Sequence, residues 1–303
     1  MDAKVPRVSI GLPVYNGEKY LASTLDSILS QTLADFELVI SDNASTDATA
    51  EICAAYAAED NRIRYTRNER NIGGARNYNR VFTLSSAPYF TWHAHDDLIG
   101  ERYLERCLEP LEKDASVALS YPRISYIDAD GETIGHQAID DLSIMSPEPA
   151  DRVRRLMTFE MSGTDIFWAG AFGVNRRSVL ETTQLLGGYN AADQVLVLQV
   201  LLRGKFAQVD DPLYFRRDHP EASMAANSKP KDVLKWFDPD IEKRFVLPHW
   251  KLCAQHIASV HRAGLGATAE LRADYHILRR FRKEWRNFPG DVKLAARDLV
   301  ATT

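Results

Sequence analysis

Residues 8–41, VSIGLPVYNGEKYLASTLDSILSQTLADFELVIS, contain the pattern that decides the fold class. Two short runs of apolar and β-branched residues, Val8–Leu12 and Phe36–Ser41, predict strands. Between them, residues 20–30 repeat leucine and isoleucine at helical spacing, which predicts a helix with one apolar face. The same alternation of strands and helices continues to about residue 130. It predicts an α/β fold in which a mostly parallel sheet carries helices on both faces.

The rest of the chain is expected to complete this domain and to add a helical part. Segments typical of strands and helices continue, less regularly, from residue 131 to about residue 230. Beyond that point the pattern is helical. We therefore expect one domain over residues 1–230, built of two halves at about 1–130 and 131–230. A helical C-terminal extension is expected over residues 231–303.

The composition narrows the class of protein. The chain has 37 basic and 42 acidic residues, and its formal net charge of -5 argues against nucleic acid as the main partner. Its 3 cysteines are far apart and form no CxxC pair, so neither a zinc ribbon nor a disulfide framework is predicted. The first residues show no secretory signal, and the apolar runs fall short of the about 20 residues that span a bilayer. We expect a cytoplasmic protein.

Three of the predicted strands are followed by unusual polar residues. Because ligands of open parallel sheets bind beyond the carboxyl ends of the strands, we expect segments 13–18, 42–47 and 95–97 to lie along one edge. Asp96 and Asp97 are adjacent carboxylates, and their repulsion becomes useful only beside a cation. Each segment alone is also explained as a turn or a helix cap. Together they indicate a metal-dependent site.

Several motifs occur together in the order and spacing of a known family. They are VSIGLPVYN at 8–16, SILSQT at 27–32, FELVISDNASTD at 36–47, NIGGARN at 71–77 and HDD at 95–97. Through them, about residues 7–220 resemble the family 2 glycosyltransferases, which have the Rossmann-like GT-A fold. The resemblance implies an inverting enzyme that moves one sugar from a UDP- or dTDP-linked donor to an acceptor hydroxyl. It also implies a role in glycan, polysaccharide or cell-surface biosynthesis.

The resemblance assigns the nucleotide sugar to residues 1–130 and the acceptor to residues 131–230. In this assignment the loop after the first strand, together with Asp42 and Asn43, holds the nucleobase, since a carboxylate accepts from an imide N–H. Arg76 would meet the diphosphate or the base. The residues assigned to the nucleotide sugar are Pro13, Tyr15, Asn16, Glu18, Asp42, Asn43, Arg76, His95 and Asp96.

The resemblance also implies a divalent cation. Asp97 would bind Mn²⁺ or Mg²⁺, which commonly completes its coordination with substrate phosphate and water. His95 stands where the family more often has Asp, whereas Asp96 would face the ribose or the sugar. His219 lies where some family members supply a late contact to the metal or the diphosphate, although an exposed loop histidine is the alternative.

A catalytic base and an acceptor surface complete the implied site. Asp193 corresponds to the family's base, which takes the proton of the acceptor hydroxyl. Its alternative role is that of a first-turn Asp stabilised by the helix dipole. Trp168 and Phe172 form either an aromatic platform for the acceptor or part of the core.

Two other classes of function are weighed against this one. The segment from His93 to Asp97 resembles the start of the HxHxDH motif of binuclear zinc hydrolases, although Leu98 replaces its last histidine. A non-catalytic protein that binds nucleotide sugar or glycan is the other alternative. Gln199–Arg203 is followed by Gly204 rather than by the Trp of the QxxRW motif of processive synthases. We therefore expect transfer of a single sugar in each encounter.

The expected partners are a nucleotide-sugar donor and a glycan or lipid-linked acceptor. A basic stretch near the C-terminus is either a solvated helix face or a peripheral contact with the inner face of an anionic membrane. That stretch is Arg279, Arg280, Arg282, Lys283 and Arg286. The sequence leaves the oligomeric state open.

Overall fold

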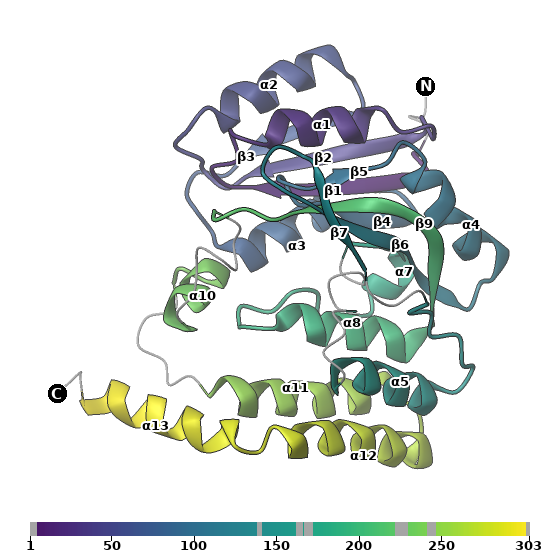
Figure 1. Ribbon diagram of the computed structural model, residues 1–303, viewed down its shortest axis with the longest axis vertical. Coiled ribbons are helices and arrows are strands. Elements are labelled where there is room, and N and C mark those ends of the chain that lie inside the picture. Colours follow the sequence, from purple (N-terminus) through teal and green to yellow (C-terminus); the bar gives the residue numbers. More distant parts are fainter. Residues whose placement is uncertain are drawn as a thin grey trace.

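The structure is a computed structural model of the 303-residue chain. It describes residues 5–137, 141–161, 166, 172–221, 230–240 and 247–300. In this part of the chain, helices cover a mixed sheet on both faces, and a further layer of helices lies beneath it (Figure 1). The α/β fold class expected from the sequence is confirmed.

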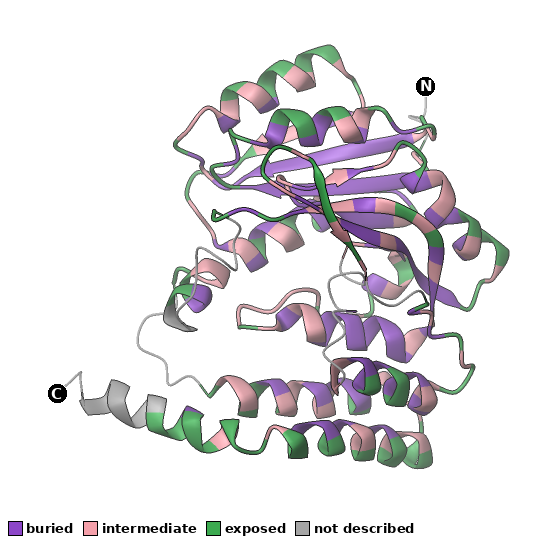
Figure 2. Ribbon diagram, viewed as in Figure 1, coloured by how far each residue is buried: buried purple, intermediate pink, exposed green. Residues whose placement is uncertain are grey.

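Parallel strands form one half of the sheet. They are β1 (Val8–Val14), β2 (Phe36–Asp42), β3 (Ile63–Arg67) and β4 (Tyr89–Trp92), in the order β3-β2-β1-β4. The register pairs Val14 with Asp42 and Asp42 with Arg67, so β1, β2 and β3 end side by side. All residues of β1 and β2 are buried, as expected for parallel strands between helix layers (Figure 2). The accompanying helices are α1 (Leu21–Leu29), α2 (Thr49–Glu59), α3 (Gly74–Leu84) and α4 (Tyr103–Lys113).

The other half of the sheet is mixed. Its strands are β5 (Leu98–Ile99), β6 (Val117–Ile127), β7 (Thr133–His136), β8 (Val174–Arg176) and β9 (Lys205–Arg217). β8 joins the halves, because it is antiparallel to both β4 and β6. β6 and β9 run parallel, whereas the short β5 is antiparallel to β9 and pairs Leu98 with Phe215. This last pairing brings the chain just after Asp97 against the end of β9.

Helices from the second half of the chain form a base beneath the sheet (Figure 1). They are α5 (Pro149–Met161), α7 (Arg177–Leu180), α8 (Ala192–Arg203), α10 (Pro230–Phe237), α11 (Pro248–Ala263), α12 (Ala267–Lys283) and α13 (Asn287–Val300). α11 packs against α8, and α12 packs against α5 and α11. Gln199 of α8 donates a hydrogen bond to Ser259 of α11 at 3.2 Å. The helical pattern expected after residue 230 is therefore present, and these helices share a core with α5 and α8.

The described helices do not include one that is both long and apolar enough to cross a bilayer. The expected boundary between residues 230 and 231 stays a prediction.

Candidate functional site

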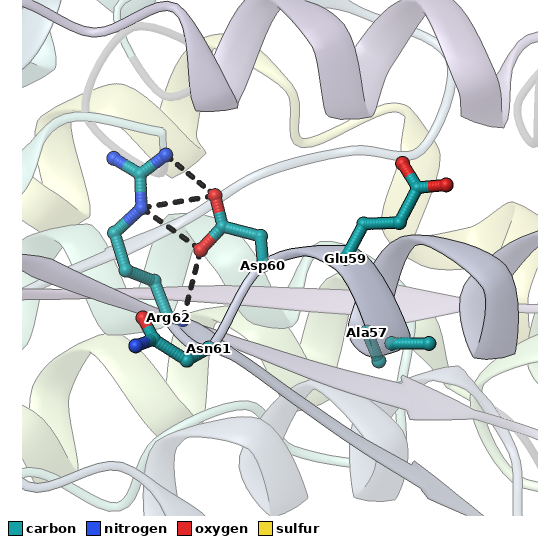
Figure 3. A pocket seen from close by; sticks show the side chains of 6 residues that line it. Ala57, Glu59, Asp60, Asn61 and Arg62 are labelled. Atoms are coloured by element: carbon teal, nitrogen blue, oxygen red, sulfur yellow. Dashed lines mark hydrogen bonds and ion pairs between the residues drawn. The ribbon is translucent and has the colours of Figure 1, made fainter.

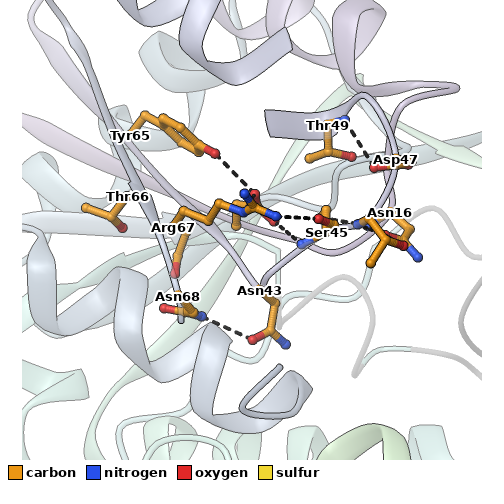
Figure 4. Close-up of polar contacts among 12 residues, drawn as sticks. Asn16, Asn43, Ser45, Asp47, Thr49, Tyr65, Thr66, Arg67 and Asn68 are labelled. Atoms are coloured by element: carbon orange, nitrogen blue, oxygen red, sulfur yellow. Dashed lines mark hydrogen bonds and ion pairs between the residues drawn. The ribbon is translucent and has the colours of Figure 1, made fainter. Parts of the chain in front are cut away.

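Hydrogen bonds join the loops that follow β1 and β2 (Figure 4). The Asn16 N–H donates to Ser45 Oγ at 2.9 Å, and Asn16 Oδ1 accepts from the Thr46 N–H at 2.9 Å. Glu18 Oε2 accepts from the Ala48 N–H at 2.9 Å, immediately before α2. The two loops therefore meet at one edge of the sheet, as the sequence predicts. Asn16 and Glu18 hold the loops together there.

Pro13 and Tyr15 occupy different positions at this edge. Pro13 is buried within β1, in register with Ser41. Tyr15 begins the following loop and is 42% exposed. Aromatic rings stack on nucleobases, so Tyr15 is the better placed of the two to contact a base through its side chain.

Asp42 lies at the end of β2 and is fully buried. Its Oδ1 accepts from the Ser45 N–H at 2.8 Å, and its Oδ2 accepts from the Tyr65 hydroxyl at 3.1 Å. The Arg67 Nε lies 3.2 Å from the same Oδ2, and Arg67 also donates to the Ser45 carbonyl at 2.7 Å. Asp42 therefore fixes a guanidinium group at the edge of the sheet. The nucleobase contact expected of Asp42 stays a prediction.

Asn43 connects the same edge to the loop before α3. Its Oδ1 accepts from the Ile72 N–H at 2.9 Å and from Asn68 at 3.1 Å. Its Nδ2 donates to Asn71 Oδ1 at 2.9 Å. Asn43 is buried, so these bonds satisfy an amide that would otherwise destabilise the fold. Asn43 thereby sets the position of the Gly73-Gly74 turn.

Asp96 and His219 form the closest pair of candidate metal ligands. His219 Nε2 lies 3.0 Å from Asp96 Oδ2, and the His219 ring packs 4.7 Å from the ring of Tyr20. Burial raises the pKa of Asp96, but the neighbouring His95 and His219 outweigh it and leave this pKa below its ordinary value. Nδ1 of His219 is buried and has no hydrogen-bond partner within the described part of the chain.

Asp97 has a different environment. It is 2% exposed; its Oδ1 accepts from the Arg217 N–H at 2.8 Å and its Oδ2 from the Tyr214 hydroxyl at 2.7 Å. Burial and the charge of Asp96 raise the pKa of Asp97 to about 7. Both oxygens thus attach the loop to β9. Asp96, rather than Asp97, lies beside His219, and the metal contact predicted for Asp97 stays a prediction.

His95 packs against the loop after β1. A Cβ atom added to Gly17 would lie only 2.7 Å from the His95 ring, so a residue without a side chain is needed there. The carbonyls of His95 and Asp97 both accept from the Thr24 hydroxyl of α1, at 2.9 Å. The backbone of the HDD motif is therefore held by α1 while β9 holds its last carboxylate.

The described residues contain no group of three or more His, Cys, Asp or Glu side chains that could hold a metal ion. One carboxylate and one imidazole, Asp96 and His219, do lie together. Oxygen and nitrogen donors of this kind suit Mn²⁺. Such an ion takes several of its ligands from substrate phosphates and water. The buried, unpartnered Nδ1 of His219 is a further polar atom that a bound group could satisfy. These residues fit an ion that binds together with a diphosphate.

Arg76 is paired with acidic residues that follow α10. Its guanidinium lies 2.6 Å from Asp240 Oδ2 and 3.2 Å from Asp238 Oδ1. Arg70 lies 3.2 Å from the other oxygen of Asp240. Two guanidinium groups near the start of α3 therefore share the carboxylates of the segment 238–240.

The end of α10 also contacts the glycine pair before Arg76. Gly73 has a φ of +88°, and an added Cβ atom would lie 2.6 Å from the Phe237 carbonyl. At Gly74 the added atom would lie 2.8 Å from the Trp236 ring. Both glycines are thus needed for close packing under α10. The predicted contact of Arg76 with the diphosphate or the base remains a prediction.

Asp193 lies in the first turn of α8 and is half-buried. The preceding Ala191 has a left-handed φ of 60°, which turns the chain sharply into the helix. Burial and the charges of Asp96, Asp97 and Asp193 raise the pKa of Tyr78 on α3. The three carboxylates therefore lie near enough to influence one phenol group electrostatically. The structure brings the predicted base and the predicted metal-side carboxylates to a shared region.

The two residues proposed for the acceptor have different outcomes. Trp168 lies outside the described residues. The half-buried Phe172 packs its ring 5.7 Å from Tyr214, and its carbonyl accepts from the Tyr103 hydroxyl at 2.5 Å. Phe172 therefore packs against Tyr214, the tyrosine that donates a hydrogen bond to Asp97. Its acceptor role stays a prediction.

Sequence reasoning missed Arg67 and Tyr78. Arg67 ends β3 and is level with Asp42, so the rule that ligands bind beyond strand ends points to it as well. Tyr78 lies in the middle of α3, and no sequence signal separates it from an ordinary packing residue.

A shallow pocket formed by residues 57–62 lies where β3 begins, at the opposite edge of the sheet (Figure 3). Asp60 and Arg62 pair with each other there at 2.7 Å.

The sequence and the fold match a large class of enzymes that transfer sugars. The model of the glycosyl transferase family 2 matches residues 9–183, and the chain belongs to this family. Glycosyltransferase GlyG of Streptococcus pneumoniae serotype 4 is 25% identical over 239 residues, which cover 77% of this chain and 79% of that protein. Chondroitin synthase of Escherichia coli is 34% identical over 134 residues, covering 44% of this chain and 19% of the synthase. The protein is a glycosyltransferase.

Solved structures show the same fold. TarS 1–349 of S. aureus, in complex with UDP-GlcNAc, has a TM-score of 0.66 at 17% identity. The match covers 90% of this chain and 72% of the TarS chain. The mannosyltransferase PcManGT of Pyrobaculum calidifontis, in complex with GDP-Man and Mn²⁺, has a TM-score of 0.54 at 15% identity. That match covers 99% of this chain and 75% of PcManGT. Membership of the glycosyl transferase family 2 contradicts the alternative of a binuclear zinc hydrolase. In that alternative His93 would bind zinc, whereas here its Nδ1 bonds to the Ala94 carbonyl at 2.6 Å.

Proposed function

We propose that this glycosyltransferase inverts the configuration of one sugar, which it transfers from a UDP- or dTDP-linked donor to an acceptor hydroxyl. The proposal rests on Asp96, which pairs with His219 at 3.0 Å in the loop after β4, and on Asp193 in the first turn of α8. One carboxylate at the donor and another at the acceptor are what a single displacement at the anomeric carbon requires. The products we assign to it are glycans, polysaccharides or other cell-surface polymers.

The donor would bind at the edge where β1, β2 and β3 end. Tyr15 is placed to contact the base, and Arg67, which Asp42 orders, adds a cation at the same edge. A fixed guanidinium group suits a ligand that carries two phosphates. The complex of TarS with UDP-GlcNAc, a protein of the same fold, supports a uridine nucleotide as the first donor to test.

We assign the divalent cation to Asp96 and His219, and we give Asp97 the role of fixing the loop. Asp96 is paired with an imidazole, whereas both oxygens of Asp97 accept protein hydrogen bonds. A bound Mn²⁺ or Mg²⁺ would supply positive charge where the leaving diphosphate becomes more negative. The structure of PcManGT with GDP-Man and Mn²⁺ is consistent with such an ion in this fold.

Asp193 would accept the proton of the attacking hydroxyl. As that oxygen bonds to the anomeric carbon, the bond from this carbon to the diphosphate breaks, and the nucleoside diphosphate leaves with the electron pair. Asp193 lies in the first turn of α8, where the partial positive charge of a helix start favours an acidic side chain. Its half-buried position limits competition by water.

The donor can be identified by thermal-shift and calorimetric titration with UDP-, dTDP- and GDP-sugars, each with and without Mn²⁺. A ligand that binds the folded state raises the melting temperature by mass action, so the preferred nucleotide should give the largest rise, and only with the metal. A larger shift with GDP-sugars, or the same shift without metal, would contradict the proposed donor or the proposed ion.

The stereochemistry has its own test. With an α-linked donor and water as acceptor, early NMR spectra should show β-configured free sugar before it mutarotates. α-Configured product would refute inversion. No release of nucleoside diphosphate with any donor, despite tight binding, would favour the alternative of a non-catalytic nucleotide-sugar or glycan-binding protein.

A further inference from the structure

An apolar stripe runs along the outer face of α12. Leu271, Tyr275 and Leu278 are 71%, 62% and 53% exposed, and Trp285, just past the helix end, is 60% exposed. Their spacing of four, three and seven residues places them on one side of a helix. Within the helix, from Leu271 to Leu278, the stripe extends over about 10 Å at 1.5 Å per residue. It is an unusual set of large apolar side chains to leave in contact with water.

The opposite face of α12 is part of the core. Ala273, Ile277 and Phe281 are buried there, and α12 packs against α5 and α11. Figure 2 shows the exposed residues of α12 on the side that faces away from these helices. The stripe therefore lies on the outside of the helical base, and the fold of the described chain does not require it.

The charges beside the stripe are of one sign. Over residues 267–293, all of which the structure describes, every exposed charged side chain is a cation. These cations are Arg272, Arg279, Arg282, Lys283, Arg286 and Lys293. The whole chain, in contrast, carries a formal net charge of -5. Cationic charge is thus gathered on this face of an acidic protein.

The acidic residues of the same stretch are turned away from the stripe. Glu270 and Asp274 lie 3.2 and 3.1 Å from the His261 imidazole, on the side of α11. Glu284 is intermediate in exposure and lies 3.8 Å from the buried Arg280. The outer face therefore combines leucine, tyrosine and tryptophan with mostly cationic groups; Arg272 also pairs with Asp151 of α5 at 3.1 Å.

We infer that the outer face of α12, from Leu271 to Arg286, docks the protein on an anionic lipid surface. Aliphatic and aromatic side chains would enter the boundary between headgroups and acyl chains, while the cations would bind lipid phosphates. A second copy of the chain fits less well, because two such faces would bring like charges together. A soluble polyanion would satisfy the cations but would leave the apolar stripe in water.

Vesicle sedimentation tests this surface with the full chain and without any donor, so its result does not depend on the proposed reaction. We expect binding to vesicles of phosphatidylcholine with phosphatidylglycerol, no binding to phosphatidylcholine alone, and release at high salt. The variant R279Q/R282Q/R286Q should bind roughly 100-fold more weakly, from about 1 kcal/mol for each cation at a membrane surface. The matched variant R7Q/R102Q/K113Q removes the same charge from exposed positions elsewhere and should bind like the wild type.

A separate variant tests the role of the apolar side chains. L271S/L278S should also lose binding, and Trp285 fluorescence, taken as the difference between wild type and W285F, should shift to shorter wavelength on anionic vesicles. If L271S/L278S binds like the wild type while the charge variant does not, the face binds polyanions and the inference is wrong. It is also wrong if the two charge variants bind equally, or if the wild type is a dimer that L278S converts to a monomer. Unchanged melting temperatures of the variants exclude misfolding as the cause.

Discussion

The imidazole Nε2 of His219 lies 3.0 Å from the Oδ2 of Asp96, although 123 residues separate them in the chain. The pairing of β5 with β9 causes this proximity, since it fixes the HDD loop beside the chain that leaves β9. Asp97 and Asp96 thereby have opposite surroundings: one accepts hydrogen bonds from β9 and the other faces an imidazole. Adjacent carboxylates can thus serve structure and ligand binding separately.

The first prediction separates these two carboxylates. Asp96→Asn should weaken Mn²⁺-dependent nucleotide binding at least about tenfold, or 1.4 kcal/mol, with little change in melting temperature. Asp97→Asn should instead leave that affinity within about twofold, because both oxygens of Asp97 accept hydrogen bonds from β9 and neither pairs with His219. Calorimetric titration measures both affinities. If Asp97→Asn weakens nucleotide binding and Asp96→Asn does not, the metal ligand is Asp97.

Asp193→Asn should reduce the rate of transfer about 10²- to 10⁴-fold, the usual contribution of a general base. The nucleotide affinity should stay the same, because the substitution changes the acceptor side only. Release of nucleoside diphosphate reports the rate, and titration reports the affinity. Full activity of the variant would show that another group accepts the proton.

Asp240→Asn should strengthen nucleotide binding. The carboxylate pairs with Arg76 at 2.6 Å and with Arg70 at 3.2 Å, so its removal releases Arg70 and leaves Arg76 paired with Asp238 alone. The melting temperature should change little, because exposed ion pairs contribute little to stability. Asp211→Asn is the matched control, since Asp211 is equally exposed and pairs with Arg106 at 2.7 Å. Equal affinity in the wild type and both variants would show that Arg76 does not contact the donor.

The contribution of His256 to stability should fall as the pH falls below 6.5. Burial lowers the pKa of His256 from 6.5 to about 3, and its Nδ1–H donates to the Leu252 carbonyl at 2.8 Å. Between these values the unfolded chain binds a proton at this residue that the folded chain does not. From pH 6.5 to pH 5 this contribution falls by about 2 kcal/mol, whereas Asp97, with a pKa raised to about 7, contributes in the opposite direction.

Urea unfolding at both pH values tests this linkage. Relative to the wild type, His256→Asn should gain about 2 kcal/mol in free energy of unfolding between pH 6.5 and pH 5, whereas substitution of the exposed His136 by Asn should leave the pH dependence unchanged. The wild-type pH dependence in both variants would contradict the assignment to His256.

Sequence patterns predicted the edge of the sheet well and the direction of individual side chains less well. Period-two and helical patterns are local, so the strands and the meeting of their terminal loops followed from the sequence. The pairing of β5 with β9 is different. β5 has only two residues, Leu98 and Ile99, and no pattern marks its distant partner. Because neighbouring side chains point in different directions, this unpredicted pairing decided whether Asp96 or Asp97 turned toward His219.

The second residue that sequence analysis missed illustrates the same limit. Tyr78 is one aromatic residue among several in the first half of the chain, and only the three-dimensional arrangement places its hydroxyl under the influence of Asp96 and Asp193. Arg67 was within reach of the strand-end rule, but arginine at a strand end is ordinary on a surface. Its importance comes from Asp42, which is fully buried and holds it in place.

The packing of α8, α11 and α12 has a consequence for the acceptor. Asp193 lies at the start of α8, α11 packs against α8, and α12 packs against α11. α11 therefore separates α8 from α12, with neighbouring helix axes about 8–10 Å apart. If α12 rests on a bilayer as inferred above, this stack of helices fixes the distance between Asp193 and the lipid surface. It would hold the catalytic base at a constant height above the lipid, so an acceptor anchored in the membrane would be extended only at the hydroxyl that reaches that height.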